Sequence, residues 1–443
     1  MADTIAGTAP AVRDPARWRA PMLVPLGLAL LAAGTVAYGV SRDLGGVVLG
    51  APHPPFIAAW DPRLHPAAAA AVALLAAAVL GAPRLLAPRV GPRAFALAAF
   101  AGTLVLRLAL AVLRDGPAAW SRVFDVTRSG EAKNEYLAGL PALRYGTRFF
   151  LDRFAELAPS LPVHVAGHPP GLMVLIGELG VDTPARLAAL CIVAGAASAP
   201  LTYVLARGLT TERTARVAAL LVGMAPGALQ YGATSADALY LSLGLAAAWG
   251  LTSPRRAARA AGAAGLAVAS FFAWSLLAVG AWAALAVWLR GERRRALELA
   301  ALCVLAVGAL YAALAALFGF DAIGALRATG EVYRLGVASM RPYAFWLFGS
   351  PVAFLLGLGL PIAWLAARGL GRGDRLAVAI WVVIAISAML GFTKAETERI
   401  WLFYAPYVCL AAAPLVTRQG LVPLLALLAG QGLLAEALFG TPW

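Results

Sequence analysis

The chain has 443 residues, of which 61% are hydrophobic and only 13% are charged. Soluble domains carry roughly 25% charged residues, so this composition excludes an ordinary water-soluble protein. The net charge of +14 would suit a nucleic-acid-binding protein. However, the arginines cluster between long apolar runs, a pattern that orients membrane helices, and we expect no nucleic acid among the partners. The three cysteines, Cys191, Cys303 and Cys409, each lie inside an apolar run, which predicts buried packing residues and neither a disulfide framework nor a zinc site.

Apolar runs of about 20 residues, the length that crosses a bilayer, recur along the whole chain. They predict an all-α, polytopic transmembrane helix bundle with about 13 spans, in a range of about 11–14. We expect a single membrane domain over residues 1–443, without a separate soluble domain. The expected spans are 21–40, 67–82, 94–113, 184–206, 217–230, 235–251, 260–273, 275–289, 296–317, 344–366, 376–393, 400–416 and 421–438.

Two of these regions allow more than one interpretation. The first run is long for a signal peptide and no clear cleavage site follows it, so we expect an uncleaved first helix. As one helix, residues 260–289 would be about 45 Å long. Arginines flank this stretch at both ends, and both ends therefore favour the cytoplasm. This predicts a hairpin of two short helices that turns near Trp274–Ser275.

The arginine clusters agree on one orientation in a bacterial inner membrane, with the N-terminus on the cytoplasmic side. Abundant alanine and arginine with only two lysines indicate a bacterial genome of high GC content. All four histidines and both lysines fall in the segments that this orientation places outside. The largest of these segments is the extracytoplasmic loop 114–183, for which we expect short helices at Glu131–Leu140 and Thr147–Leu157, the second amphipathic and lying along the membrane surface. The outer segments are 41–66, 114–183, 318–343 and 394–399.

The first candidate site is Glu131-Ala-Lys-Asn-Glu135-Tyr136, in the large outer loop. Glu131 and Glu135 are four residues apart and would lie on one face of a helix. A carboxylate at the membrane boundary can be desolvated, which raises its pKa toward that of a useful general base. The same residues also fit a solvated helix start with an acidic first turn.

Two further segments carry cationic candidates. In Gly167-His168-Pro169-Pro170-Gly171, the prolines fix the backbone and place His168 where the chain re-enters the membrane, although a simple helix-starting turn has the same pattern. Lys394 and Arg399 lie in a short charged segment between two apolar spans. There they suit a phosphate, or they belong to an ordinary turn between helices.

Other polar residues near the membrane have two interpretations each. Asp237 begins a membrane helix with Ser235 as an expected N-cap, and capping alone would explain the pair. Arg334 and Arg341 lie among aromatic residues that suit a headgroup or a sugar, or that form an ordinary interfacial belt. Arg107 lies within a span, where we expect it to pair with an acid or to extend to the outer interface.

In their order along the chain, these motifs resemble the GT-C glycosyltransferases, polytopic enzymes that use lipid-phosphate sugars as donors. The likeness is to the protein O-mannosyltransferase and aminoarabinose-transferase branch, and it covers scattered short motifs over residues 94–416. That branch has an acidic residue beside a tyrosine in an outer loop, and a lysine- or histidine-Pro-Pro sequence some thirty residues on. The matching motifs here are Glu135-Tyr136, His168-Pro169-Pro170, Pro226 with Asp237, and Lys394 with Tyr404-Ala-Pro406.

The chain departs from this pattern at two places. The catalytic loop of the family follows the first helix, whereas here it follows the third expected span. The usual Asp-Glu pair is Asn134-Glu135 in this sequence. The assignment of the base therefore keeps two rivals in the first outer loop, Asp43 and Asp61.

The resemblance implies transfer of a sugar from a polyprenyl-phosphate donor to a hydroxyl of a cell-envelope glycan or glycolipid, with membrane lipids as surroundings. It implies Glu135 as the base. The expected phosphate-binding residues are Lys394, Arg399, Arg341 and His168. The expected substrate contacts are Tyr136, Asp237, Glu131 and Arg334. No ligand spacing is diagnostic of a metal, so no metal site is predicted, and a divalent cation stays open.

Two other functions remain open from the sequence. One is a lipid or glycolipid transporter or flippase, and the other is a non-catalytic subunit for envelope assembly. A transporter would carry polar residues near the middle of the bilayer. Charges within the expected spans are sparse and gather instead in the outer segments, which favours an enzyme at the membrane surface.

Overall fold

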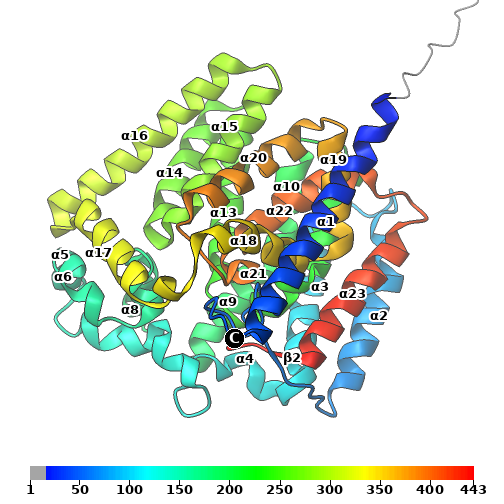
Figure 1. Cartoon of the computed structure of the whole chain (residues 1–443). Coiled ribbons are helices and arrows are strands. Elements are labelled where there is room, and N and C mark those ends of the chain that lie inside the picture. The colour runs from blue at the N-terminus through cyan, green and yellow to red at the C-terminus, as the bar shows by residue number, and fades with distance from the viewer. Residues whose placement is uncertain (1–15) are drawn as a thin grey trace, which may run out of the picture.

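The computed structural model describes residues 16–443 and shows a bundle of helices with almost no β-structure (Figure 1). Residues 1–15 of the predicted membrane domain lie outside the described part of the chain. The predicted all-α character is confirmed, apart from one pair of two-residue strands. Local sequence explains many helix ends. For example, Asp374 accepts hydrogen bonds from two backbone N–H groups at the start of one helix, and Gly391 ends that helix with a φ of +62°.

Among the described residues, six helical segments are long and apolar enough to cross a membrane, or up to seven when one bent pair counts as a single span. That pair bends by 116° at Gly359, which has a φ of +124°. The apolar helices indicate a membrane protein, whereas helix length does not establish the predicted count of about 13 spans. The long segments are formed by α1 (Ala16–Leu44), α2 (Ala68–Leu85), α3 (Pro92–Asp115), α9 (Pro184–Ala196) with α10 (Ser198–Arg207), α16 (Arg293–Phe318) and α23 (Leu421–Leu438); the bent pair is α18 (Tyr343–Leu358) with α19 (Leu360–Gly371).

Several other expected spans coincide with helices that are shorter than a bilayer is thick. Proline and serine interrupt the chain at Pro226 and Ser235, so that the two expected spans 217–230 and 235–251 become three short, buried helices. The predicted break near Trp274–Ser275 is confirmed, because one helix ends at Phe272 and the next begins at Leu277. The short helices are α11 (Glu212–Met224), α12 (Pro226–Thr234), α13 (Asp237–Thr252), α14 (Arg256–Phe272), α15 (Leu277–Leu289), α20 (Arg375–Leu390) and α22 (Ala405–Ala412), with the 3-10 helices η5 (Trp274–Leu276), η7 (Leu402–Tyr404) and η8 (Ala413–Leu415).

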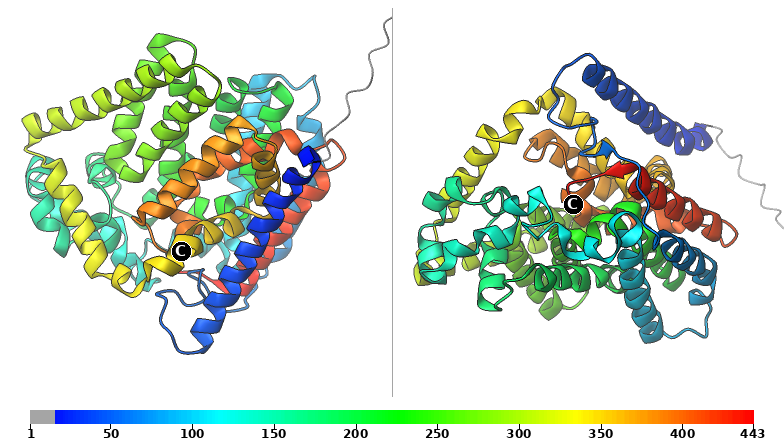
Figure 2. Two further views of the ribbon diagram at one scale, coloured as in Figure 1. Left: turned by 45° about the horizontal axis from the view of Figure 1, so that its top comes forward. Right: turned by 90° about the horizontal axis from the view of Figure 1, so that it is seen from below.

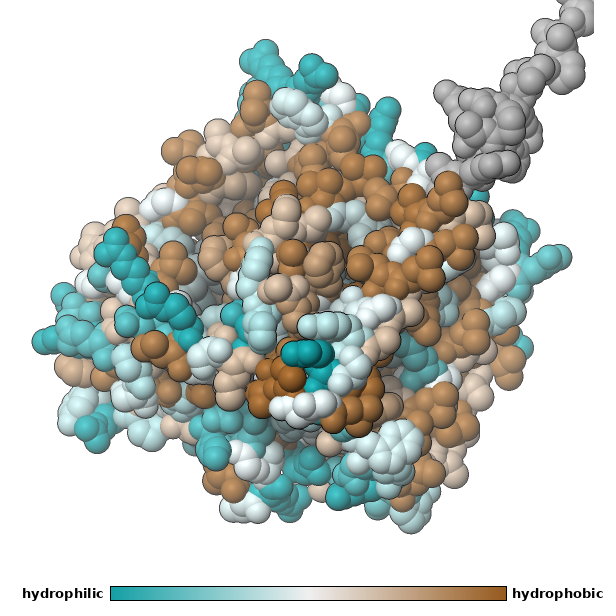
Figure 3. All heavy atoms as spheres, in the orientation of Figure 1, coloured by the Kyte–Doolittle hydropathy of each residue, from teal (hydrophilic) through white to brown (hydrophobic). Residues whose placement is uncertain are grey.

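The surface supports the membrane assignment. On the face in Figure 3, hydrophobic side chains form a band across the middle, and hydrophilic side chains gather at the top, the bottom and the left. Only 6% of the most apolar stretch of α16 is buried inside the protein. Exposed leucine and valine side chains along this helix, such as Val304 and Leu305, would meet lipid rather than water.

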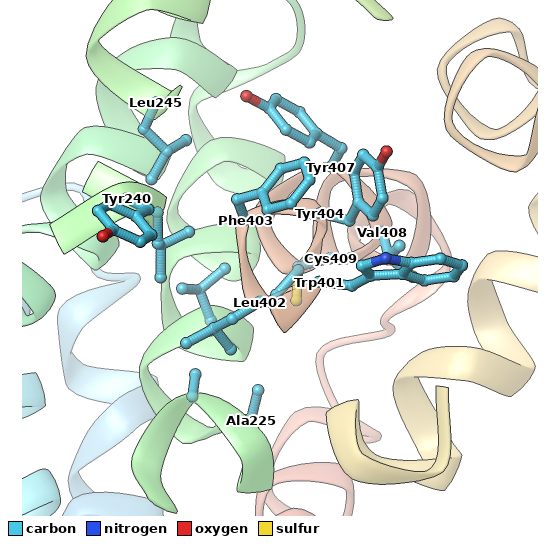
Figure 4. Packing of buried hydrophobic residues seen from close by; sticks show 14 of the residues in the cluster. Ala225, Tyr240, Leu245, Trp401, Leu402, Phe403, Tyr404, Tyr407, Val408 and Cys409 are labelled. Carbon is cyan, nitrogen blue, oxygen red and sulfur yellow. The ribbon is translucent and has the colours of Figure 1, made fainter. Parts of the chain in front are cut away.

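The interior is a continuous core in which α22 and η7 pack against α11, α13, α19 and α20. Figure 4 shows Phe403 on the side that faces Tyr240 and Leu245 of α13, with Tyr404 and Tyr407 next to Phe403. This core fixes the start of α13 and the segment before η7, and both contribute to the candidate site.

Most connecting segments gather at one end of the bundle, toward the bottom of Figure 1, which we call the loop-rich end (residues 45–67, 116–183, 319–342 and 391–399). Here Ala59 pairs with Gly440 and Trp60 with Phe439 in an antiparallel strand pair. Figure 2 shows the last strand crossing this end of the molecule. The elements here are α4 (Ala119–Arg122), α5 (Thr147–Asp152), α6 (Phe154–Leu157), α7 (Val163–Ala166), α8 (Gly171–Glu178), α17 (Ala322–Leu335), α21 (Thr397–Ile400), η1 (Gly116–Ala118), η2 (Gly130–Asn134), η3 (Tyr136–Leu143), η4 (Ala158–Ser160), η6 (Val337–Met340), β1 (Ala59–Trp60) and β2 (Phe439–Gly440).

Two details of the large loop differ from the prediction. The expected helix Thr147–Leu157 is divided into α5 and α6 at Arg153. The expected helix Glu131–Leu140 is replaced by the 3-10 helices η2 and η3, which are separated by an extended Glu135. Gly139 within the expected helix, and Gly130 and Pro141 at its two ends, disfavour a regular α-helix.

Candidate functional site

Glu135 lies at the junction between η2 and η3, with φ and ψ of −86° and 170°. The hydroxyl of Ser129 accepts a hydrogen bond from the N–H of Glu131 and fixes the start of η2. The prediction that both glutamates share one α-helical face is therefore wrong, because no α-helix forms here. The extended residue nevertheless turns the carboxylate of Glu135 into the protein, where its side chain is only 2% exposed.

The two glutamates meet at His164, on α7. Nε2 of His164 lies 3.1 Å from a carboxylate oxygen of Glu131 and 3.7 Å from one of Glu135. The three potential ligand atoms lie within 4.8 Å of one another, and nitrogen and oxygen ligands of this kind suit a divalent cation. This triad (Glu131, Glu135 and His164) thus fits a metal ion as well as a base with a histidine partner.

A second group of charges adjoins this triad. Arg399, on α21, donates to Asp237 at 2.7 Å and to Glu396 at 3.0 Å. Arg341 donates to the other carboxylate oxygen of Glu396 at 2.8 Å. The predicted start of α13 at Asp237 is confirmed, but its N-cap is Ala236 and not the expected Ser235. The hydroxyl of Ser235 accepts from the N–H of Asp237 and donates to its carboxylate.

The backbone in front of α21 is strained. Ala395 and Glu396 are both non-glycine residues with left-handed φ values, +63° and +59°. Such residues cost of order 1–3 kcal/mol each and persist where the surroundings determine the conformation. Arg341 and Arg399 hold the Glu396 carboxylate from two sides, so the ion pairs and the strain belong to one arrangement. Backbone strain of this kind gathers at functional sites.

The charges of these residues influence one another. Burial raises the pKa of Glu135, and Glu131 and Asp237 add to this effect, while His164 and Arg399 oppose it. Burial alone would lower the pKa of His164, but the carboxylates of Glu135 and Glu131 outweigh it and raise that pKa. The Glu135–His164 pair and Arg399 therefore form one electrostatic unit, although separate parts of the chain supply them.

Glu396 and Glu398 are two residues apart, but burial affects their ionisation differently. Burial opposes ionisation of Glu396, but Arg399 and Arg341 lower its pKa to about 2. Burial raises the pKa of Glu398 to about 7. One oxygen of Glu398 accepts from the N–H of Ile57, and the other is buried without a hydrogen-bond partner among the described residues.

Two predicted cations have other environments. The ammonium of Lys394 donates to the backbone carbonyls of Ala338 and Arg341, at 3.0 and 2.8 Å, so it holds the end of η6. Burial lowers the pKa of His168 to about 4, so its imidazole is uncharged at neutral pH. Nδ1 of His168 bonds the carbonyl of His164 at 2.9 Å, and the residue therefore supports the triad rather than supplying a positive charge.

The four remaining predicted residues lie at four different places. Tyr136 is buried, and its hydroxyl lies 2.7 Å from that of Tyr240. Asp43 is exposed at the end of α1, and Arg334 is exposed on α17. Asp61 follows β1 and pairs with Arg114 at 2.9 Å and with Arg63 at 3.1 Å.

Arg107 adopts neither of its two predicted arrangements, an ion pair with an acid or extension to the outer interface. It is fully buried in α3, so it does not reach the interface, and it makes no ion pair with an acid within residues 16–443. Its guanidinium donates to the carbonyl of Gly232 and to the hydroxyl of Ser198. Gly195 and Gly232 leave room for it, since a Cβ at either position would overlap the guanidinium. Arg107 thereby fixes the end of α12, immediately before Ser235.

Several residues of the site do not stand out in the sequence. His164 is one of four outer histidines there, and Glu396 and Glu398 are charges in a turn. Trp443 carries no signal at all, although its ring covers the guanidinium of Arg399 at 4.1 Å and lies 6.3 Å from the ring of His164. No pattern in the sequence links Trp443 to Arg399. The gathering of histidines and acids in the outer loops is the available signal for His164.

Comparison with known proteins adds no assignment. No protein-family model matches the chain, and no curated protein matches it.

Proposed function

We propose that this protein is a membrane glycosyltransferase that moves a sugar from a polyprenyl-phosphate donor to a cell-envelope acceptor hydroxyl. The observation that carries the proposal is the buried carboxylate of Glu135, paired with His164 and interacting with the charge of Arg399 at one end of an apolar bundle. A perturbed acid beside a cation is a common arrangement in active sites. The resemblance of the motifs to GT-C enzymes supports the same reaction.

In the proposed reaction, the acceptor hydroxyl transfers its proton to the carboxylate of Glu135 while its oxygen bonds to the anomeric carbon. The bond from that carbon to the phosphate oxygen breaks, and the electron pair leaves with the polyprenyl phosphate. Inversion at the anomeric carbon follows from a single displacement. A phosphate is already a weak base and needs no proton, so one carboxylate suffices where glycosidases use two. The raised pKa of Glu135 suits a general base.

We assign the departing phosphate to Arg399. Two of its guanidinium nitrogens already bond carboxylates, but its Nε–H is buried without an acceptor among the described residues. A buried N–H without a partner costs about 1–3 kcal/mol, and a phosphate oxygen would relieve this cost. Arg341 supports the site through Glu396. Stabilisation of developing charge by pre-placed donors often contributes more to catalysis than any other effect.

Glu131, Glu135 and His164 are the residues that would hold a divalent cation, whose charge would oppose the negative charge of the phosphate. A cation there would occupy an oxygen of Glu135 and compete with its role as a base. We therefore propose metal-independent transfer. Activity should survive an EDTA titration, and loss of activity that Mg²⁺ or Mn²⁺ restores would replace this mechanism with a metal-dependent one.

The proposal includes the orientation and fold that the sequence predicts: a GT-C-like bundle of about 13 spans in the bacterial inner membrane, with a cytoplasmic N-terminus. The loop-rich end would then face the extracytoplasmic side. The arginine clusters that end α2, α10 and α19 support this orientation, because such clusters favour the cytoplasm.

A transfer assay tests this proposal. It contains purified protein, radiolabelled polyprenyl-phosphate mannose or arabinose as the donor, and a membrane fraction as the acceptor. We expect label in the acceptor fraction. Movement of the intact donor across liposomes without transfer would indicate a transporter or flippase, and neither transfer nor movement would favour a non-catalytic assembly subunit.

A further inference from the structure

A cavity of about 300 Å³ lies beside the candidate site, at the loop-rich end. Residues at the ends of α3 and α23, on α4 and next to the strand pair line it. Its charged lining consists of three acids and three arginines: Asp61, Asp115, Glu436, Arg63, Arg114 and Arg122. Neither the base nor the phosphate-binding role proposed above uses this cavity.

The arginines in the lining are all paired. Arg114 bonds Asp61 at 2.9 Å, Arg63 bonds the same carboxylate at 3.1 Å, and Arg122 bonds Asp115 at 2.5 Å. A phosphate would have to compete with these carboxylates for each guanidinium, so the lining does not favour an anion. A polyprenyl chain would desolvate these charges without replacing their hydrogen bonds. The chemistry fits a neutral ligand with many hydroxyl groups.

Trp443 forms the wall that the cavity shares with the candidate site. It lines the cavity, and its indole ring covers Arg399 at 4.1 Å. Its Nε1–H is buried without a hydrogen-bond acceptor in the part of the chain that the structure describes. An aromatic ring with a free donor can pack against the C–H face of a sugar and bond one of its hydroxyls. A ligand in the cavity would therefore lie one side chain away from Arg399 and His164.

We propose that this cavity binds a neutral sugar unit of the acceptor, with Trp443 between that unit and the reacting centre. The volume is at the lower end of the range of about 300–1,000 Å³ that small-molecule sites occupy, which suits a short saccharide. The acceptor role depends on the proposed transferase function, whereas saccharide binding in the cavity does not.

The test uses the full chain in detergent and saturation-transfer NMR, with methyl α-mannoside as the neutral probe and glucuronate as the anionic probe. Ala119→Phe fills the cavity, because Ala119 lines it. Ala118→Phe is the matched control, because the neighbouring Ala118 is exposed and does not line the cavity. Thermal melting of each variant checks that it is folded.

We expect methyl α-mannoside to bind the natural protein and Ala118→Phe, and Ala119→Phe to weaken binding by about tenfold or more. Glucuronate should bind less well than the neutral probe. Absence of saccharide binding to the natural protein, or equal binding to the two variants, would overturn the proposal. If Ala119→Phe does not fold, Arg122→Gln serves instead: it removes a guanidinium from the lining, and unchanged binding would again overturn the proposal.

The two proposals fail separately. Transfer activity with an acceptor KM that Ala119→Phe leaves unchanged would refute the cavity as the acceptor site and retain the transferase. Saccharide binding that Ala119→Phe abolishes, in a protein without transfer activity, would retain the binding site and refute the transferase.

Discussion

Replacement of Glu135 by glutamine removes one proton acceptor while keeping the size and shape of the side chain. The carboxylate is 2% exposed, and burial raises its pKa, so the amide removes a buried charge instead of creating one. The amide also removes the carboxylate that pairs with His164, which offsets this gain, so we expect the melting temperature to change little. A general base contributes about 10²–10⁴-fold to the rate, equivalent to about 3–5 kcal/mol of activation free energy. Transfer should fall by this factor.

The assay is the initial rate of sugar transfer from the radiolabelled donor, measured against pH for the natural protein and the variant. A base must lose its proton to act, so the natural rate should rise with pH above the ordinary carboxyl pKa of 4.5, and the variant should lose this dependence. Asp61→Asn and Asp43→Asn test the rival acids. Asp43→Asn is the control, because Asp43 is exposed, whereas Asp61 lines the proposed acceptor cavity. A folded Glu135→Gln protein with the natural rate would refute the assignment, and loss of the pH-dependent rate in only one of the other two variants would then move the base to that residue.

Three further predictions concern residues around the base. Arg399→Lys keeps the positive charge but loses the forked guanidinium that bonds two carboxylates. The rate of sugar transfer should therefore fall by about 10–100-fold while the protein is still expressed normally. An unchanged rate would show that Arg399 is not part of the site. Burial raises the pKa of Glu398 to about 7, from 4.5, so the folded protein keeps a proton that the unfolded chain releases. The free energy of unfolding should therefore fall as pH rises between these values, by about 3 kcal/mol at most, and Glu398→Gln should flatten this trend in thermal melting. Gly195→Ala would overlap the guanidinium of Arg107 and should destabilise by about 1–3 kcal/mol. Gly81→Ala, at a helix position with nothing within 4 Å, is its control, and equal melting of the two would contradict the packing around Arg107.

Features that depend on the local sequence could be predicted, whereas features that depend on packing between distant segments could not. Apolar runs predict helices because each run must satisfy its backbone within itself in lipid, and the break near Trp274–Ser275 followed from charge at both ends. The break between the expected spans 217–230 and 235–251 also followed, but the additional break between Met224 and Pro226 did not, because buried helices need not match the thickness of the bilayer. At Glu131, the spacing of the two glutamates suggested a helix that Gly130 and Pro141 disfavour.

The candidate site shows the same limit. Glu135 and Arg399 could be selected because charges close to hydrocarbon need a partner or a function. Their partners could not be identified from the sequence, because the contacts of Glu135 with His164 and of Arg399 with Asp237 join residues far apart in the chain. Lys394 was selected by the same rule and instead bonds backbone carbonyls, an outcome that depends on a loop conformation beyond the reach of sequence patterns.

The most direct test is an experimental structure with a non-hydrolysable polyprenyl-phosphate sugar analogue. Our account predicts that the anomeric carbon faces the carboxylate of Glu135 and that the phosphate lies against Arg399. An anomeric carbon at Asp61 or Asp43, or a phosphate at the opposite end of the bundle, would contradict it.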